Sequence, residues 1–494
     1  GFDGIVMTDW GTKQGTVKAV KAGNDLMEPG MPVEIERIVA AVNAGEITQE
    51  ELDRNVRNML EYIVRTPRFN KYQYSNKPDT KAHAELVRAA APEGMVLLEN
   101  NGALPLQGVK RVALYGTGSY DFIAGGTGSG NVNKPYIRNV AEGLTVNGFE
   151  VNQGIQKWYE QYIALAKTNL RNNGGAGGVL LGDPVISEME VSREYIERME
   201  PMTDVAIFTL SRNAGEGGDR YALDGDWTLT GQERQLIQTL ADVYHAAGKK
   251  FIVVLNIGGV IETASWKHIP DAVLLAWTPG QEGGYAVADI LCGKANPSGK
   301  LPMTFPVSYF DIPSSHNFPY NYKNVQRGEW DFLWGGPQRQ TKNVDYTEYA
   351  EGIYVGYRYF QTADVAVSYP FGYGKSYTTF EYSPIAISAT EVAAGGSVTA
   401  EVTVTNTGKV AGKEVVQMYL QDVVGSTTRP VRELKGFEKI SLEPGESKVV
   451  KFEITPELMS HYNSNLELVA EPGEFIVSVG ADSRTKNSAS FILK

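Results

Sequence analysis

Asp9 is the first residue of the chain whose type and position indicate chemistry. A short apolar run, residues 5–7, is typical of a buried parallel strand and ends at Thr8, so Asp9 and Trp10 are expected where that strand emerges. In a (β/α)₈ barrel the catalytic groups lie at this end of the strands. A carboxylate beside an indole suits a sugar ligand, with the ring stacked on a pyranose face. The residues alone leave a second interpretation open, in which Asp9 caps the next helix.

Glu216 is the second candidate carboxylate. It lies in a glycine-rich loop, residues 211–220, that follows the predicted strand 205–210. If the ligand is a sugar, two carboxyl groups about 5–5.5 Å apart could cleave its glycosidic bond, one as nucleophile and the other as acid/base. The acid must keep its proton near neutral pH, which favours a partly desolvated loop. Composition alone favours a solvated turn here, shaped by an ion pair between Asp219 and Arg220.

Glu282 is a rival carboxylate at a strand end. It begins a predicted helix, residues 284–291, and a helix N-terminus stabilises the carboxylate as an anion. A general acid must instead keep its proton, so we interpret Glu282 as structural.

Other kinds of site lack the spacing that they require. The glycines of 116–118 and 125–130 do not form a dinucleotide fingerprint, and residues 374–376 lack the upstream glycine of a phosphate-binding loop. No Gly-x-Ser-x-Gly elbow indicates an esterase. The five histidines, at positions 83, 245, 268, 316 and 461, are scattered and offer no metal-ligand spacing. We therefore expect neither a metal nor a cofactor.

Composition excludes several classes of partner. The 494 residues carry a net charge of −12, which argues against nucleic acid and anionic membranes. No apolar run approaches membrane-spanning length. The single cysteine, Cys292, excludes an internal disulfide framework and is expected to be a buried structural thiol at a helix end.

The elements that must position these residues change character along the chain. Helical periodicity covers residues 14–22 and 33–65, with a capping box formed by Thr48 and Glu51. From residue 112, apolar strands (112–115, 205–210, 251–256 and 272–276) alternate with helices, which predicts a largely parallel sheet. After residue 378 the pattern becomes short alternating strands, which indicates a β-sandwich.

Four stretches of the chain resemble glycoside hydrolase family 3, the β-glucosidase-like retaining enzymes. The stretch Gly-Phe-x-Gly-x-Val-x-Thr-Asp-Trp, residues 1–10, is similar to the nucleophile strand of the family, with Thr8 in place of the usual serine. The stretches 96–106 and 296–306 also match closely. The pattern Gly-Glu-Gly-x-Asp-Arg at 215–220 resembles the loop of bacterial members that carries the acid/base.

This resemblance implies roles for individual residues. Asp9 would be the catalytic nucleophile and Glu216 the acid/base. Trp10, Ser129 and Met27 would contact the substrate, with Ser129 supplied by the loop 125–130.

The resemblance also implies a multidomain α/β plus β fold. Residues 1–70 would form the last two βα units of a (β/α)₈ barrel, and 71–90 a linker and entry helix. An α/β sandwich domain would cover 91–310, an aromatic-rich connector 311–377 and a fibronectin-III-like domain 378–494. Because two βα units do not close a barrel, we expect a second polypeptide to supply the upstream strands.

The expected activity is release of terminal glucose from β-linked gluco-oligosaccharides or aryl glucosides. A β-xylosidase or another family 3 glycosidase (α-arabinofuranosidase, N-acetylglucosaminidase) is an alternative within the enzyme class, and a non-catalytic carbohydrate-binding or structural fragment is the alternative outside it. The oligomeric state is left open, with a homo-oligomer among the options. The N-terminus does not define the compartment; we favour a periplasmic or secreted bacterial protein, with a cytoplasmic one as the alternative.

Overall fold

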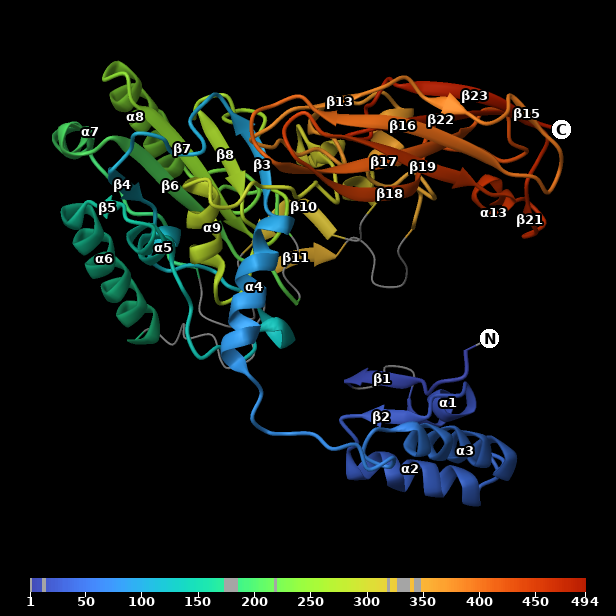
Figure 1. Cartoon of the computed structure of the whole chain (residues 1–494). Coiled ribbons are helices and arrows are strands. Elements are labelled where there is room, and N and C mark those ends of the chain that lie inside the picture. The colour runs from blue at the N-terminus through green and yellow to red at the C-terminus, as the bar shows by residue number, and fades with distance from the viewer. Residues whose placement is uncertain are drawn as a thin grey trace. The chain divides into compact units, whose positions relative to one another are not determined.

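The computed structural model describes residues 2–10, 15–172, 185–216, 220–317, 320–326, 338–341 and 348–494. By its internal contacts the chain divides into unit 1, Gly1–Thr80, and unit 2, Lys81–Lys494, both drawn in Figure 1. The division falls within the linker predicted at 71–90. None of the helices in the described ranges has the length and apolar character needed to cross a membrane.

Unit 1 contains two βα units. Its elements are β1 (Met7–Trp10), α1 (Thr16–Lys21), β2 (Leu26–Glu28), α2 (Pro32–Asn43) and α3 (Gln49–Arg65). The two strands pair in parallel, as barrel strands do. The predicted capping box of α3 is confirmed: Thr48 and Glu51 each accept a hydrogen bond from the other's backbone N–H. A small core of Val20, Ala41 and Ile47 joins the helices to β2.

The strand positions in unit 1 differ from the sequence prediction in two respects. The first strand runs over Met7–Trp10, so Asp9 lies within it rather than after it. This strand is also exposed instead of buried, because β2 is its one hydrogen-bonded neighbour in the described part of the chain. Asp25 precedes β2 and accepts hydrogen bonds from Val6 N–H and Asn58 Nδ2.

Unit 2 contains all of α4 (Thr80–Gly94) except its first residue, followed by a six-stranded sheet in the order β3-β8-β7-β6-β4-β5. Five strands are parallel, and β3 at one edge is antiparallel to β8, which confirms a largely parallel sheet. The strands are β3 (Val96–Asn100), β4 (Arg111–Tyr115), β5 (Glu150–Val151), β6 (Val205–Arg212), β7 (Lys250–Ile257) and β8 (Ala272–Leu275).

Helices cover both faces of this sheet. Alternate residues of β6 face opposite cores: Phe208 packs in the one that contains α6 (Gln153–Asn172), α7 (Arg193–Met199) and α8 (Gly231–Ala246). Ile207 packs in the other, with α5 (Val140–Val146) and α9 (Gly283–Leu291). The central strands are therefore apolar on both faces, which is why their sequence reads as continuous hydrophobic runs.

The C-terminal part of unit 2 is a β-sandwich, shown in orange and red in Figure 1. One sheet contains β13 (Phe380–Tyr382), β14 (Ala386–Ile387), β16 (Val398–Asn406) and β19 (Ser447–Ile454). The other contains β15 (Glu391–Val392), β17 (Gly412–Asp422), β18 (Glu433–Leu442), β22 (Gly473–Gly480) and β23 (Ser488–Leu493). Alternate residues of β16 are buried between the sheets, as its period of two predicts.

The connector between the two domains of unit 2 contains short elements rather than a featureless chain. They are α10 (Ser314–Asn317), β10 (Tyr320–Gln326), β11 (Gln338–Thr341), α12 (Tyr357–Thr362) and β12 (Val367–Tyr369). Strand β12 pairs with β9 (Phe305–Pro306), which returns the chain to the sheet domain before the sandwich begins.

Candidate active site

Asp9 and Trp10 lie side by side at the carboxyl end of β1 in unit 1. The Asp9 side chain is exposed, and its Oδ1 accepts a hydrogen bond of 2.7 Å from the Trp10 backbone N–H. The Trp10 residue is 76% exposed. Both groups are therefore accessible to a ligand, and the backbone bond restricts the rotation of the carboxylate.

Met27, the other substrate contact expected in unit 1, lies in the middle of β2. It is partly buried against the core of Val20, Ala41 and Ile47, and its sulfur lies 3.4 Å from Asn24 Nδ2. The described contacts of Met27 are internal to unit 1, and its contact with a substrate stays a prediction.

Glu216 follows the carboxyl end of β6, where a parallel α/β sheet presents its loops. Its Oε2 accepts two hydrogen bonds from Ser129, one from the backbone N–H and one from the hydroxyl, each 2.9 Å long. The two residues are 87 positions apart in the sequence. The structure therefore joins two residues that were predicted separately, Ser129 as a sugar contact and Glu216 as the acid/base.

The loops that carry these residues are also joined by their backbones. Thr127 forms a parallel bridge with Gly215, and its N–H donates to the Ala214 carbonyl at 3.0 Å. A Cβ on Gly215 would lie 2.3 Å from the Thr127 backbone nitrogen, and one on Gly128 would lie 2.4 Å from the Glu216 Cβ. Only glycine permits this close approach of the two loops.

The surroundings of Glu216 differ from the expectation in one respect. Glu216 is exposed, so the described part of unit 2 does not supply the partial desolvation expected of a general acid. Asp219, expected to pair with Arg220, lies outside the described residues. Arg220 donates to Asp226 Oδ1 at 2.8 Å, and its pairing with Asp219 stays a prediction.

The residues that hold the base of this loop were not predicted as functional. Arg212, the last residue of β6, forms two short hydrogen bonds with Glu233, of 2.7 and 2.6 Å, and both side chains are buried. Glu233 also closes a capping box with Thr230 at the start of α8. The Thr-x-x-Glu spacing at 230–233 was the available signal, but it indicates a helix start and not a partner for Arg212.

The remaining sequence candidates occupy structural positions. Glu282 is buried at the N-terminus of α9, and its Oε1 accepts a hydrogen bond of 2.6 Å from the Tyr136 hydroxyl. Cys292 ends the same helix and is partly rather than fully buried. Across the described ranges, no group of three or more His, Cys, Asp or Glu side chains has the geometry of a metal site.

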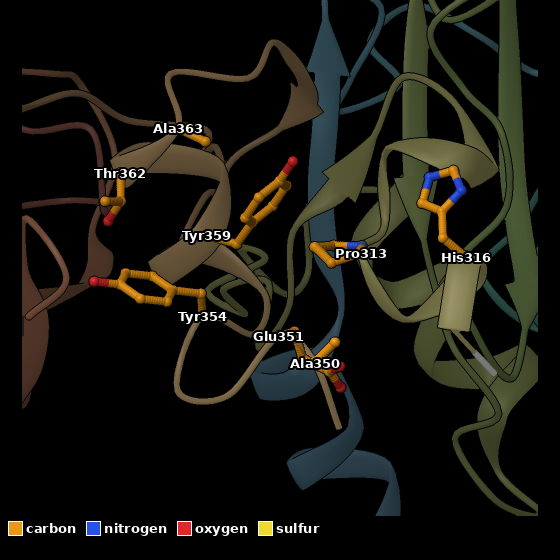
Figure 2. Close-up of a pocket in the computed structure, with 8 residues that line it drawn as sticks. All are labelled: Pro313, His316, Ala350, Glu351, Tyr354, Tyr359, Thr362 and Ala363. Atoms are coloured by element: carbon orange, nitrogen blue, oxygen red, sulfur yellow. The ribbon is translucent and has the colours of Figure 1, made fainter. Parts of the chain in front are cut away.

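A pocket of about 560 Å³ lies elsewhere in unit 2. Figure 2 shows the side chains around it, which include Tyr354, Tyr359 and His316. Its described lining residues all belong to the range 313–363 and include no residue of the loops that carry Ser129 and Glu216. Within unit 1 the candidate residues are thus Asp9 and Trp10, and within unit 2 they are Ser129 and Glu216.

Comparison with protein families gives two matches within unit 2. The Glycosyl hydrolase family 3 C-terminal domain matches residues 95–357, which cover the sheet domain and most of the connector. The Fibronectin type III-like domain matches residues 414–483 of the sandwich.

Individual proteins match over nearly the whole chain. Thermostable beta-glucosidase B of Acetivibrio thermocellus is 34% identical over 489 residues, which are 98% of this chain and 58% of the relative. An exo-alpha-(1->6)-L-arabinopyranosidase of Bifidobacterium breve is 30% identical over 98% of this chain and 58% of its own length. The solved structure of beta-glucosidase 3B of Thermotoga neapolitana with alpha-D-glucose is 40% identical, with a TM-score of 0.88, and the match covers 100% of this chain and 66% of that one.

Proposed function

Because the chain belongs to glycoside hydrolase family 3, we propose that it is the part of a retaining β-glucosidase that carries both catalytic carboxyl groups. The chain spans 58% of the Acetivibrio thermocellus relative and 66% of the Thermotoga neapolitana structure, and we assign the proposed activity to a protein of that greater length. The proposed substrates are β-glucosides and short β-glucans, from which terminal glucose is released.

The reaction proceeds in two displacements. In the first, Asp9 attacks the anomeric carbon and forms a glycosyl ester, while Glu216 gives its proton to the leaving oxygen. In the second, the Glu216 carboxylate takes a proton from water, and the water oxygen attacks the same carbon and releases Asp9. Two inversions leave the configuration of the sugar unchanged. No cofactor takes part.

One observation carries this proposal: the hydrogen-bonded pair of Ser129 and Glu216 at the carboxyl end of β6. An exposed carboxylate held by a serine on a glycine-rich loop is suited to meet a bound sugar. A solvated turn, the plainer interpretation of this loop, would not require glycine at both Gly128 and Gly215 to admit a second loop.

We also propose that additional barrel strands complete unit 1. Strand β1 has one hydrogen-bonded neighbour in the described part of the chain, and a closed barrel gives each strand two. Phe2 and Met7 are 78% and 62% exposed. Exposure of such large apolar side chains to water is energetically unfavourable unless another segment covers them. A second polypeptide or the remainder of a longer chain would meet this need.

The proposal is tested by trapping the glycosyl-enzyme. The chain is incubated with a 2-deoxy-2-fluoro-glucosyl fluoride, alone and together with the complementary barrel segment, and its intact mass and peptides are measured. We expect one fluoroglucosyl group on Asp9 when the barrel is complete. The matched control Asp9→Asn keeps the shape of the side chain but should take up no label.

Each other outcome selects a different conclusion. A label on another carboxylate would reject Asp9 as the nucleophile. No label with glucose but a label with the corresponding xylose or arabinose reagent would move the proposal to another glycosidase, an alternative favoured by the similarity to an exo-alpha-(1->6)-L-arabinopyranosidase. No label with any sugar would favour a non-catalytic carbohydrate-binding protein.

A further inference from the structure

We infer that Asp226 is a positioning residue that holds both ends of the loop carrying Glu216. The loop leaves the sheet at Arg212, the end of β6, and its described part resumes at Arg220. The effect of Asp226 on catalysis rests on the function proposed above. The hydrogen bonds by which Asp226 holds the loop do not depend on that function.

The far end of the loop is held by the Asp226 carboxylate. Arg220 Nη1 donates to Asp226 Oδ1 at 2.8 Å, and the Tyr221 backbone N–H donates to Oδ2 at 2.7 Å. The other nitrogens of the Arg220 guanidinium, Nε and Nη2, have no acceptor within the described structure. Both oxygens of the Asp226 carboxylate therefore accept a hydrogen bond, one from the Arg220 side chain and one from the Tyr221 backbone.

The near end of the loop is held by the Asp226 backbone. Arg212 Nε donates to the Asp226 carbonyl at 3.3 Å, while its two terminal nitrogens bind Glu233 and the Ser211 carbonyl. Asp226 thus contacts both Arg212, where the Glu216 loop begins, and Arg220, where its described part resumes.

The turn that contains Asp226 is itself fixed to the domain core. Trp227 is buried, and its ring lies edge-on to Tyr309 at 5.5 Å. The Trp227 carbonyl accepts a hydrogen bond of 2.8 Å from Glu262 N–H, and the Tyr309 hydroxyl donates to the Arg220 carbonyl at 3.1 Å. Asp226 therefore connects the loop to a turn whose next residue, Trp227, is buried.

This arrangement matters for a general acid because proton transfer requires a fixed distance to the leaving oxygen. Ser129 also holds Glu216, but the bond to Ser129 involves the same carboxylate that must move a proton. The ties at Asp226 hold the loop without using the Glu216 carboxyl group. Asp226 would thus keep Glu216 in place when substrate displaces the contact with Ser129.

The test is Asp226→Asn, which keeps the size of the side chain but leaves one acceptor oxygen for two donors. Hydrogen–deuterium exchange at residues 213–216 should accelerate by roughly tenfold or more, because the loop opens more often. In the completed enzyme, kcat/KM for alkyl glucosides and disaccharides should fall roughly tenfold or more, and that for a dinitrophenyl glucoside, which needs no acid, less than about twofold.

Asp224→Asn is the matched control. Asp224 lies in the same turn and accepts hydrogen bonds from Thr228 and Arg234, but its side chain is 61% exposed and its described contacts include neither end of the loop. Exchange and activity should stay at the wild-type level. If Asp226→Asn does not fold, Arg220→Lys, which keeps the charge but loses the planar fork, tests the same tie.

The outcomes separate this inference from the proposed function. Unchanged exchange in both Asp226→Asn and Arg220→Lys would overturn it, as would an equal loss of activity on all leaving groups. If exchange is faster in Asp226→Asn but the completed wild-type protein hydrolyses no glycoside, the role of Asp226 in holding the loop stands and the proposed function is rejected.

Discussion

Individual residues of the candidate site are placed by close backbone approach. Gly128 has a φ of +71°, a conformation that side-chain-bearing residues rarely adopt, and it lies against the Glu216 side chain. The next residue, Ser129, then directs both its N–H and its hydroxyl at one oxygen of Glu216. Glycine at 128 is thus a requirement of the contact and not merely of a flexible loop.

Replacing Gly128 with alanine should displace Glu216. The new Cβ would lie 2.4 Å from the Glu216 Cβ, which cannot move away without its backbone. We expect kcat/KM of the completed enzyme to fall by roughly 10–100-fold on substrates that need an acid. Gly130→Ala is the control, since a Cβ there meets nothing within 4 Å, and it should retain wild-type kinetics. Equal activity of the two variants would contradict the proposed position of Glu216.

Glu188 should make the stability of unit 2 depend on pH. Burial raises the pKa of its carboxyl group to about 7, although hydrogen bonds from Thr117 N–H and the Tyr159 hydroxyl act in the opposite direction. The folded protein therefore binds this proton more tightly than the unfolded chain, whose carboxyl group has the usual pKa of 4.5. Its contribution to stability is complete below pH about 4.5 and is lost as the pH rises through about 7.

The measurement is the melting temperature at pH 5 and pH 8 for wild type and Glu188→Gln. We expect the wild-type protein to lose several degrees between these values and the variant, which cannot ionise, to lose less. An identical pH dependence of the two proteins would show that Glu188 does not ionise in this range.

Among the elements, β6 and α8 matter most for the position of Glu216. The loop that carries Glu216 begins at the end of β6, and the turn that contains Asp226 leads into α8. The two elements are joined by the ion pair between Arg212 and Glu233, whose side chains are 8% and 5% exposed. Glu233 also accepts the Thr230 N–H at 2.7 Å, so the cap of α8 and the end of β6 share one carboxylate. The positions of strand end and helix start are therefore coupled.

Arg212→Met should destabilise unit 2 by about 3–5 kcal/mol, because it leaves the buried Glu233 carboxylate without its cation. Arg234→Met, in the same region, removes an exposed ion pair with Asp224 and should cost less than about 1 kcal/mol. Urea unfolding measures both. Equal losses of unfolding free energy in the two variants would mean that the buried ion pair contributes no more to stability than the exposed one.

At the scale of the whole molecule, the β-sandwich is tied to the sheet domain by charged groups. Lys300 and Glu414 form an ion pair of 2.9 Å across the two domains, with both side chains largely buried. Glu93, near the end of α4, binds Lys413 and Lys439 of the sandwich and accepts the Ser298 hydroxyl. Burial raises the pKa of Glu93, but these hydrogen bonds outweigh it and lower the pKa to about 2. The sandwich thus supports the helix that enters the sheet domain.

Glu93→Gln should weaken this support. We expect the melting temperature to fall by about 2–4 °C, with earlier exposure of the sandwich in a proteolysis assay. The control Glu438→Gln removes an exposed ion pair with Lys448 within the sandwich and should leave the melting temperature unchanged. A fall of equal size in the control would assign the effect to the sandwich alone.

The sequence by itself determined the features that depend on near neighbours in the chain. Apolar runs marked the central strands of the sheet, alternation marked β16, and the Thr48–Glu51 spacing marked the start of α3. Motif resemblance selected Asp9 and Glu216 and indicated the family, which the domain matches then established.

Only the tertiary structure decided which distant residues meet. The bond between Ser129 and Glu216 spans 87 positions, and neither residue carries a local signal for the other. The same holds for Asp226, whose carboxylate and carbonyl reach two ends of one loop. The first strand was misplaced because a sequence pattern assumes the neighbours of a complete sheet, whereas β1 has one described neighbour and its residues are exposed. Periodicity reports how a segment is buried; the choice of partner depends on how the whole chain packs.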